Sequence, residues 1–246
     1  MLGSFWLALQ FLTRIPVPVQ FHPTPQDWGR SVLAYPLVGL LIGVVLVLLH
    51  WLLANADPGV QAGLLLLVWA LITGGVHLEG LANSADAWAG GHGDRQRTLD
   101  ILKDPRSGPA AMMVVVLAMI LKFAALSVLV AESALEIILL APVLGRSAIA
   151  ALLLTTPYAQ MDEIGAERAT NVPRQAVSWT LAAVAAGALF LVGWGGLVLL
   201  FLLFIGGYML RRMMIHRIGG LSKDTAGAIC ELTEVGVLTI VVLVWG

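Results

Sequence analysis

Oxygen-bearing side chains recur at helical spacing in one polar stretch of the chain. Glu79, Asn83 and Asp86 are separated by four and three residues, so on a helix they lie on one face. Carboxylate and amide oxygens suit a hard cation such as Mg²⁺. Three glycines nearby allow close approach of the backbone to a ligand: Gly74, Gly75 and Gly80. The stretch predicts a metal or phosphate site; the alternative is a polar helix end solvated by headgroups.

A second acidic face follows near the C-terminus. Asp224, Gly227, Glu231 and Glu234 are spaced by three, four and three residues, again one face of a helix. The two glutamates fall inside an apolar segment, where an unpaired carboxylate costs several kcal/mol. They therefore need a partner, which is a bound cation, an Arg or Lys, or each other when protonated.

Two cations, Lys122 and Arg146, stand deep in other apolar segments. Such groups are candidate functional residues and are expected to face the interior of a helix bundle. Arg146 lies about 10 residues, or roughly 15 Å, from the end of its segment. From there it can reach Glu231, Glu234 or a bound anion, so we predict a substrate-binding or ion-pairing role. For both cations the alternative is that the side chain snorkels to the surface.

A short basic loop contains Lys103, Asp104 and Arg106. Cations beside a carboxylate are typical of sites that handle phosphates, and Arg can bind a phosphate with two hydrogen bonds. Taken alone, the loop reads as an ordinary basic loop at a membrane surface.

The composition indicates what kind of chain positions these residues. Of 246 residues, 59% are hydrophobic and 12% are charged, and the net charge is −1 with a single cysteine. These values exclude a soluble globule, a disordered chain, a disulfide scaffold and a basic nucleic-acid binder. We therefore predict an all-α integral membrane protein that forms one polytopic domain over residues 1–246.

A helix needs about 20 residues to cross the hydrocarbon core. The apolar segments predict seven crossings, at residues 32–53, 60–78, 110–130, 134–155, 176–193, 195–210 and 228–245. The fifth and sixth are separated at a glycine-rich cluster, residues 193–196. The N-terminal run, residues 5–12, is too short to cross and predicts an interfacial or re-entrant helix.

Basic residues fix an orientation for these crossings. Apart from Lys122 and Arg146, all 12 Lys and Arg fall on one side of the predicted membrane. The positive-inside rule makes that side cytoplasmic. We expect the N-terminus and the polar stretches in the cytoplasm and the C-terminus outside.

At these same residues the sequence resembles the cobalamin-5′-phosphate synthase family, the adenosylcobinamide-GDP ribazoletransferases. The family pattern G-G-x-H-x-D-G-L-x-D-x-x-D is similar to residues 74–86, and the likeness continues in residues 102–108 and 219–234. The segments at residues 11–18 and 35–39 also resemble the family. The chain departs from the pattern at Glu79 and Asn83, where Asp is usual, and at Lys223, where Gly is usual.

The resemblance implies the last step of corrinoid nucleotide-loop assembly, in the inner (cytoplasmic) membrane of a bacterium. Adenosylcobinamide-GDP and α-ribazole, or its 5′-phosphate, would give adenosylcobalamin, or its 5′-phosphate, and GMP. It implies Mg²⁺ as cofactor and the lipid bilayer as surroundings, with no nucleic acid. A homo-oligomer, or contact with other cobalamin-assembly enzymes, is left open.

Residue roles follow from this resemblance. Mg²⁺ is expected at Glu79, Asn83, Asp86 and Asp224. Asp224 or Glu231 is expected to accept a hydroxyl proton, while Lys103 and Arg106 neutralise phosphate charge. The expected substrate-binding residues are His77, Asp104, Lys122, Arg146, Gly219, Gly220 and Glu234.

Two other functions compete with this prediction. A CDP-alcohol-type phosphotransferase uses similar acidic helices, but no Ala-Arg pair follows Asp86 at the spacing of its signature. A transporter would use Lys122, Arg146 and the two glutamates as a midplane ion or proton path. Against the transporter, the acidic clusters sit at one membrane face.

Overall fold

The computed structural model describes residues 2–17, 23–104, 106–159 and 170–245. Within these ranges the chain is helical, and its only β-type pairing is an isolated bridge between Tyr158 and Leu221. The helices are α1 (Leu2–Leu12), α2 (Pro25–Ser31), the 3₁₀ turn η1 (Val32–Ala34), α3 (Tyr35–Leu52), α4 (Pro58–Thr73), α5 (Val76–Gly90), α6 (Arg95–Leu102), α7 (Pro109–Ala131), α8 (Leu135–Thr155), α10 (Arg174–Val192), α11 (Trp194–Ile218) and α12 (Lys223–Trp245).

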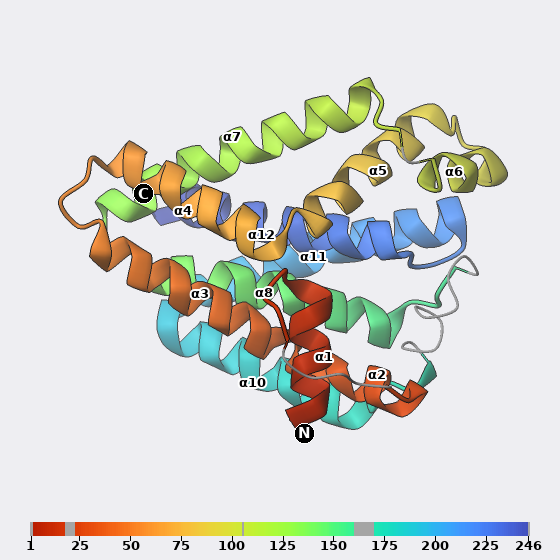
Figure 1. Cartoon of the computed structure of the whole chain (residues 1–246), viewed down its shortest axis with the longest axis horizontal. Coiled ribbons are helices and arrows are strands. Elements are labelled where there is room, and N and C mark those ends of the chain that lie inside the picture. Colours follow the sequence, from red (N-terminus) through yellow and green to blue (C-terminus); the bar gives the residue numbers. More distant parts are fainter. Residues whose placement is uncertain (1, 18–22, 105, 160–169, 246) are drawn as a thin grey trace.

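The described helices confirm the predicted class of polytopic membrane protein. Six are long and apolar enough to cross a membrane: α2–α3 taken as one, α7, α8, α10, α11 and α12. The pair α4 and α5 would be a seventh crossing, bent by 87° at its break. The long helices run side by side, with the α3–α4 and α7–α8 turns at one end of the bundle and α6 at the other (Figure 1).

The bend between α4 and α5 corrects the predicted crossing at residues 60–78. Helix α4 ends at Thr73, five residues before the predicted end. Gly74 and Gly75 both take left-handed backbone angles, with φ of +62° and +69°, which residues other than glycine rarely adopt. Two such residues in succession end α4 and turn the chain into α5.

Two further helix boundaries differ from the prediction. Helix α11 continues to Ile218 rather than ending at residue 210, so Arg211, Arg212 and Arg217 lie on a helix. Helix α12 begins at Lys223 rather than residue 228. Hydropathy marks only the apolar part of a crossing, whereas a helix extends past it, and cations in a last turn are favourable there. The predicted break at Gly193, between α10 and α11, is confirmed.

The short N-terminal helix is also confirmed. Helix α1 places Leu7, Ala8, Leu9 and Leu12 in the hydrophobic core. Its position relative to a bilayer stays a prediction.

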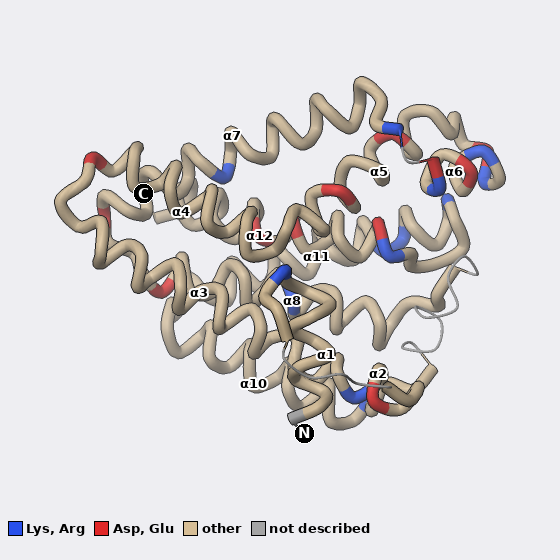
Figure 2. Tube along the Cα trace, in the orientation of Figure 1, with Lys and Arg blue, Asp and Glu red and all other residues tan. Residues whose placement is uncertain are grey.

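Helix α8 is the most buried of the crossings. In its most apolar 18-residue window 83% of residues are buried, compared with 56% in α12 and only 11% in α10 and in α11. The last two are therefore the helices most open to lipid. Most charged residues gather at the end of the bundle that holds α6 and the start of α12 (Figure 2), which we call the polar end.

Candidate active site

Helices α5 and α12 cross in backbone contact at two glycines, Gly80 and Gly227. A Cβ atom on Gly80 would lie 2.6 Å from the backbone oxygen of Asp224. A Cβ atom on Gly227 would lie 3.2 Å from the Cα of His77 and 3.3 Å from that of Gly80. The two helices can approach this closely because neither crossing residue carries a side chain.

This crossing brings the two predicted acidic faces together. Asn83 follows Gly80 by one helical turn, and Asp224 precedes Gly227 by one turn. The Asn83 Nδ2 donates a hydrogen bond of 2.9 Å to Asp224 Oδ1. Glu79 is exposed, and its charge acts on Asp224. Three of the four predicted metal ligands therefore form one group at the polar end.

The fourth, Asp86, has a structural partner. Its carboxylate accepts hydrogen bonds from the backbone N–H groups of Gly108, at 2.5 Å, and Ala111, at 2.9 Å. Gly108 is the N-cap residue of α7 and Ala111 lies in its first turn, where N–H groups have no intrahelical partner. Asp86 thus caps α7 and attaches it to α5, and its predicted metal role stays a prediction.

The donor set of this group is small for a metal site made by protein alone. Within residues 2–17, 23–104, 106–159 and 170–245, no group of three or more His, Cys, Asp or Glu could hold a metal ion. Mg²⁺, however, is commonly bound by one or two carboxylates together with water and the phosphates of a substrate. Glu79 and Asp224 supply two carboxylates, and the Asn83 amide orients the second. These residues fit a Mg²⁺ ion that is completed by a diphosphate.

Farther along α12 from this group lies a buried set of four charged residues. We call it the tetrad, and it consists of Lys122, Arg146, Glu231 and Glu234. The Lys122 ammonium donates to Glu231, at 2.8 Å, and to Glu234, while the Arg146 guanidinium donates to the other oxygen of Glu234. The four side chains are at most 4% exposed. The tetrad thus pairs two basic side chains with two acidic ones. The predicted interior position and the predicted ion pairing are both confirmed.

The tetrad connects α12 to α7 and α8. Its glutamates lie about two and three turns beyond Asp224 on the same face of α12, so their pairing fixes the rotation of α12 that directs Asp224 toward α5. His77 is also buried, and its Nδ1 lies 3.5 Å from the Arg146 guanidinium. The substrate-binding roles predicted for His77, Lys122, Arg146 and Glu234 stay predictions, as does proton acceptance by Glu231. In the structure these side chains contact one another.

Comparison with known proteins decides the family. The family model described as cobalamin-5-phosphate synthase matches residues 4–242. The chain belongs to the cobalamin-5-phosphate synthase family. It is 50% identical over 235 residues to the adenosylcobinamide-GDP ribazoletransferase of Pseudomonas entomophila (strain L48), covering 95% of this chain and 96% of the relative. The proteins of that name from Pseudomonas putida (strain W619) and Pseudomonas syringae pv. syringae (strain B728a) are 48% and 46% identical over 234 residues, with the same coverage. No solved structure matches the chain.

The basic loop of this synthase-family chain lies beside the site because Asp86 binds Gly108. Within the loop, Arg106 pairs with Asp104 at 2.7 Å. Hydrogen bonds from Arg106 lower the pKa of Asp104 to about 2, so Asp104 is ionised at neutral pH and accepts no proton there. The Arg106 side chain is 88% exposed, and Lys103 is exposed too. Their predicted roles toward phosphate stay predictions.

The two glycines predicted to bind substrate have backbone reasons to be glycine. Gly219 ends α11 with φ of +84°, and a Cβ atom on Gly220 would overlap the carbonyl group of Pro157. Both hold the turn that leads into α12. Their contact with substrate stays a prediction.

Three arginines were not singled out by sequence reasoning. Arg14 lies against Gly74 at the α4–α5 bend, and Arg95 lies against Gly219. Arg217 donates a hydrogen bond of 2.8 Å to the carbonyl of Trp88 and so attaches α11 to α5. In the sequence they are ordinary membrane-flanking cations, and no local spacing separates them from the others.

Proposed function

We propose that this chain is an adenosylcobinamide-GDP ribazoletransferase, which joins adenosylcobinamide-GDP to α-ribazole or α-ribazole 5′-phosphate and releases GMP. The observation that carries the proposal is the hydrogen bond between Asn83 and Asp224, which unites the two acidic helices in one group. Family membership and the names of the relatives support it.

In the proposed reaction, a ribazole hydroxyl oxygen forms a bond to the cobinamide-side phosphorus. The bond from that phosphorus to the oxygen of GMP breaks, and GMP leaves as an anion. Such transfers depend mainly on positioning and on neutralising phosphate charge. The hydroxyl proton goes to a carboxylate oxygen that is not bound to the metal ion, and we assign it to Oδ2 of Asp224, because Asn83 occupies only Oδ1. Glu231 is a weaker candidate, because its carboxylate is buried against Lys122.

Glu79 and Asp224 would hold Mg²⁺, with Asp86 as a third oxygen ligand through the remaining lone pairs of its carboxylate. When bound, the ion supplies positive charge to the diphosphate and to the departing GMP. The remaining phosphate charge would face exposed cations of the polar end, among them Lys103, Arg106 and Arg95, together with Arg14 at the α4–α5 bend. We place the polar end and the N-terminus in the cytoplasm of a bacterium and the C-terminus outside the inner membrane, because of the distribution of basic residues.

A transporter is less well supported. Its ion path would need charged groups that exchange with water, whereas the four tetrad residues are at most 4% exposed and are paired with one another.

The test is turnover by the purified protein in phospholipid vesicles. Adenosylcobinamide-GDP and α-ribazole 5′-phosphate are supplied with Mg²⁺ or with EDTA, and GMP and the corrinoid product are measured by chromatography. Stoichiometric release of both products with Mg²⁺ alone is expected. Absence of GMP with Mg²⁺, combined with substrate-independent ion flux across the vesicles, would replace the transferase with a transporter.

A further inference from the structure

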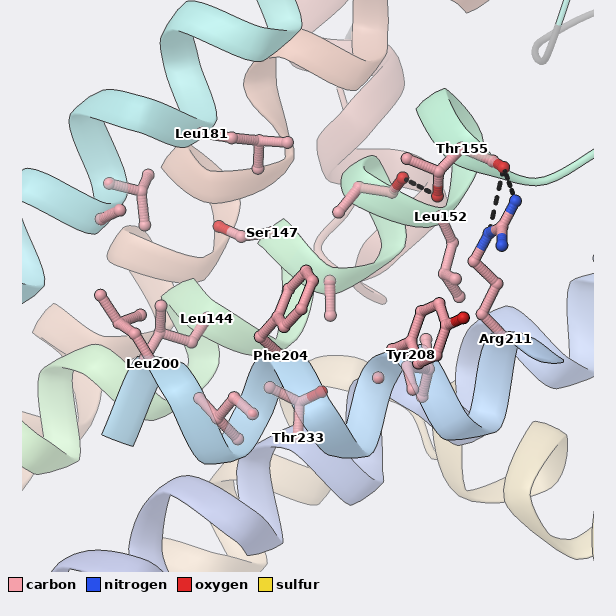
Figure 3. A pocket seen from close by; sticks show the side chains of 17 residues that line it. Leu144, Ser147, Leu152, Thr155, Leu181, Leu200, Phe204, Tyr208, Arg211 and Thr233 are labelled. Carbon is pink, nitrogen blue, oxygen red and sulfur yellow. Dashed lines mark hydrogen bonds between the residues drawn. The ribbon is translucent and has the colours of Figure 1, made fainter. Parts of the chain in front are cut away.

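An apolar cavity lies among the last helices of the chain. It has a volume of about 590 Å³ and lies between α8, α10, α11 and α12, within the roughly 300–1,000 Å³ of small-molecule sites. Most of the residues that line it are apolar, among them Leu144, Leu152, Leu181, Leu200 and Phe204 (Figure 3). Because α10 and α11 are the least buried crossings, the cavity faces the hydrocarbon of a bilayer.

One end of this cavity is polar. Tyr208 and Arg211 line it there, next to Thr155 at the end of α8 (Figure 3). The Arg211 Nε donates a hydrogen bond of 3.1 Å to the carbonyl of Thr155. The guanidinium of Arg174, at the start of α10, donates to the neighbouring carbonyl of Leu154. Two arginines therefore bind neighbouring carbonyl groups in the last turn of α8.

A second, smaller cavity adjoins this end. It has a volume of about 370 Å³, and its lining includes Arg174 and Thr155, the latter shared with the apolar cavity. Among the described residues, the ion pairs use only Lys122, Arg146 and Arg106 as cations. Within that part of the chain, the charges of Arg174 and Arg211 thus have no carboxylate partner.

We propose that the two cavities form a binding site for one anionic phospholipid. An acyl chain lies in the apolar cavity along Phe204 and Leu200, and the phosphate lies at Arg211 and Arg174. The apolar part would accept the chain of any phospholipid, whereas the two arginines, which have no carboxylate partner among the described residues, favour a headgroup with net negative charge. This site is separate from the proposed catalytic group and does not depend on the proposed function.

Two adjacent glycines of α11 provide a matched test. A Cβ atom on either Gly206 or Gly207 would have no neighbour within 4 Å, but only Gly207 lines the cavity. Gly207→Leu fills the cavity with side-chain atoms, whereas Gly206→Leu adds the same atoms outside it. Both variants and the wild type are delipidated in detergent and incubated with phosphatidylglycerol, phosphatidylcholine or inorganic phosphate, and bound molecules are counted by native mass spectrometry.

We expect the wild type to retain one phosphatidylglycerol per chain, with about tenfold or greater preference over phosphatidylcholine. Gly207→Leu should lose most of this retention and Gly206→Leu none. The double variant Arg174→Gln/Arg211→Gln should keep lipid binding but lose the preference, which tests the proposal even if Gly207→Leu does not fold.

Three results would overturn the proposal. If Gly206→Leu and Gly207→Leu retain the same amount of phosphatidylglycerol, the cavity does not bind the lipid. Competition by inorganic phosphate without any lipid preference would assign the arginines to a free anion. If the wild type is a dimer and only the Gly207→Leu variant is a monomer, the cavity binds a second copy of the chain and not a lipid.

Discussion

The side-chain amide of Asn83 donates a hydrogen bond of 2.9 Å to the carboxylate of Asp224, a residue 141 positions later in the chain. The contact exists because α5 and α12 cross at Gly80 and Gly227, one turn away on each helix. The candidate active site is therefore formed by helix packing, and changes to the crossing and to the polar side chains should have distinguishable effects.

Asn83→Asp should make the thermal stability of the protein depend on Mg²⁺ and should raise the affinity of the site for the ion. The change replaces a hydrogen-bond donor with a carboxylate opposite Asp224, and like charges repel unless a cation lies between them. In EDTA the thermal midpoint should fall, and Mg²⁺ should restore it. The Mg²⁺ concentration for half-maximal GMP release should fall by about tenfold, because a further charged ligand raises affinity. Asn83→Ala, which adds no charge, is the control. A midpoint that does not respond to Mg²⁺ would contradict the placement.

Gly80→Ala should damage the site without touching a polar side chain. The new Cβ atom would lie 2.6 Å from the Asp224 carbonyl oxygen, so α12 must move away from α5. Overpacking of this kind costs about 1–3 kcal/mol, and GMP release should fall because Asp224 moves with its helix. Gly206→Ala, which has open space, should keep full activity in the same assay. Wild-type turnover by Gly80→Ala would show that the close crossing is unimportant.

Two variants can decide whether Asp86 acts as a helix cap or as a metal ligand. Asp86→Asn keeps an oxygen for the N-terminus of α7 but loses the charge, whereas Asp86→Ala loses both. If Asp86 acts only as a cap, Asp86→Ala should lower stability by about 1 kcal/mol and Asp86→Asn should retain most activity. A Mg²⁺ requirement raised by Asp86→Asn, with an unchanged thermal midpoint, would instead make Asp86 a metal ligand.

Glu234→Gln should strongly destabilise the bundle. Removing one partner from a buried ion pair costs about 3–5 kcal/mol, because the opposite charge is left uncompensated. The double variant Glu234→Gln/Arg146→Met removes a charge of each sign and should recover much of the loss, as measured by thermal unfolding in detergent. Full GMP release by the refolded double variant would make the pair structural. Recovered stability without turnover would support the substrate-binding role predicted for these residues.

Much of this arrangement follows from the sequence. Burying an unpaired charge in an apolar segment is so costly that Glu231, Glu234, Lys122 and Arg146 had few partners except one another. The acidic helix faces likewise follow from spacing alone. Periodicity alone could not bring Asn83 to Asp224, because it defines the face of a helix but not the helix that it meets. Only the family resemblance placed the two residues at one site.

The sequence predicts the end of α4 five residues too late, at residue 78 and not at Thr73. Residues 74–78 contain no Asp, Glu, Lys or Arg and include Val76 and Leu78, so hydropathy extends the crossing through them. Backbone conformation ends the helix instead, through two consecutive left-handed glycines. Arg14 and Arg95 were overlooked for a related reason, since each lies against a glycine that only the folded chain brings near it.

The central claim is that Asp224, held by Asn83, is part of a Mg²⁺-dependent transfer site. The most direct measurement is GMP release from adenosylcobinamide-GDP and α-ribazole 5′-phosphate by Asp224→Asn and wild-type protein in vesicles, across a range of Mg²⁺ concentrations. Asp57→Asn, at the N-cap of α4 at the opposite end of the bundle, is the matched control, because Asn also caps a helix. We expect Asp224→Asn to release GMP at least about 100-fold more slowly, with an unchanged thermal midpoint, and Asp57→Asn to match the wild type. Wild-type turnover by Asp224→Asn at every Mg²⁺ concentration would contradict the claim.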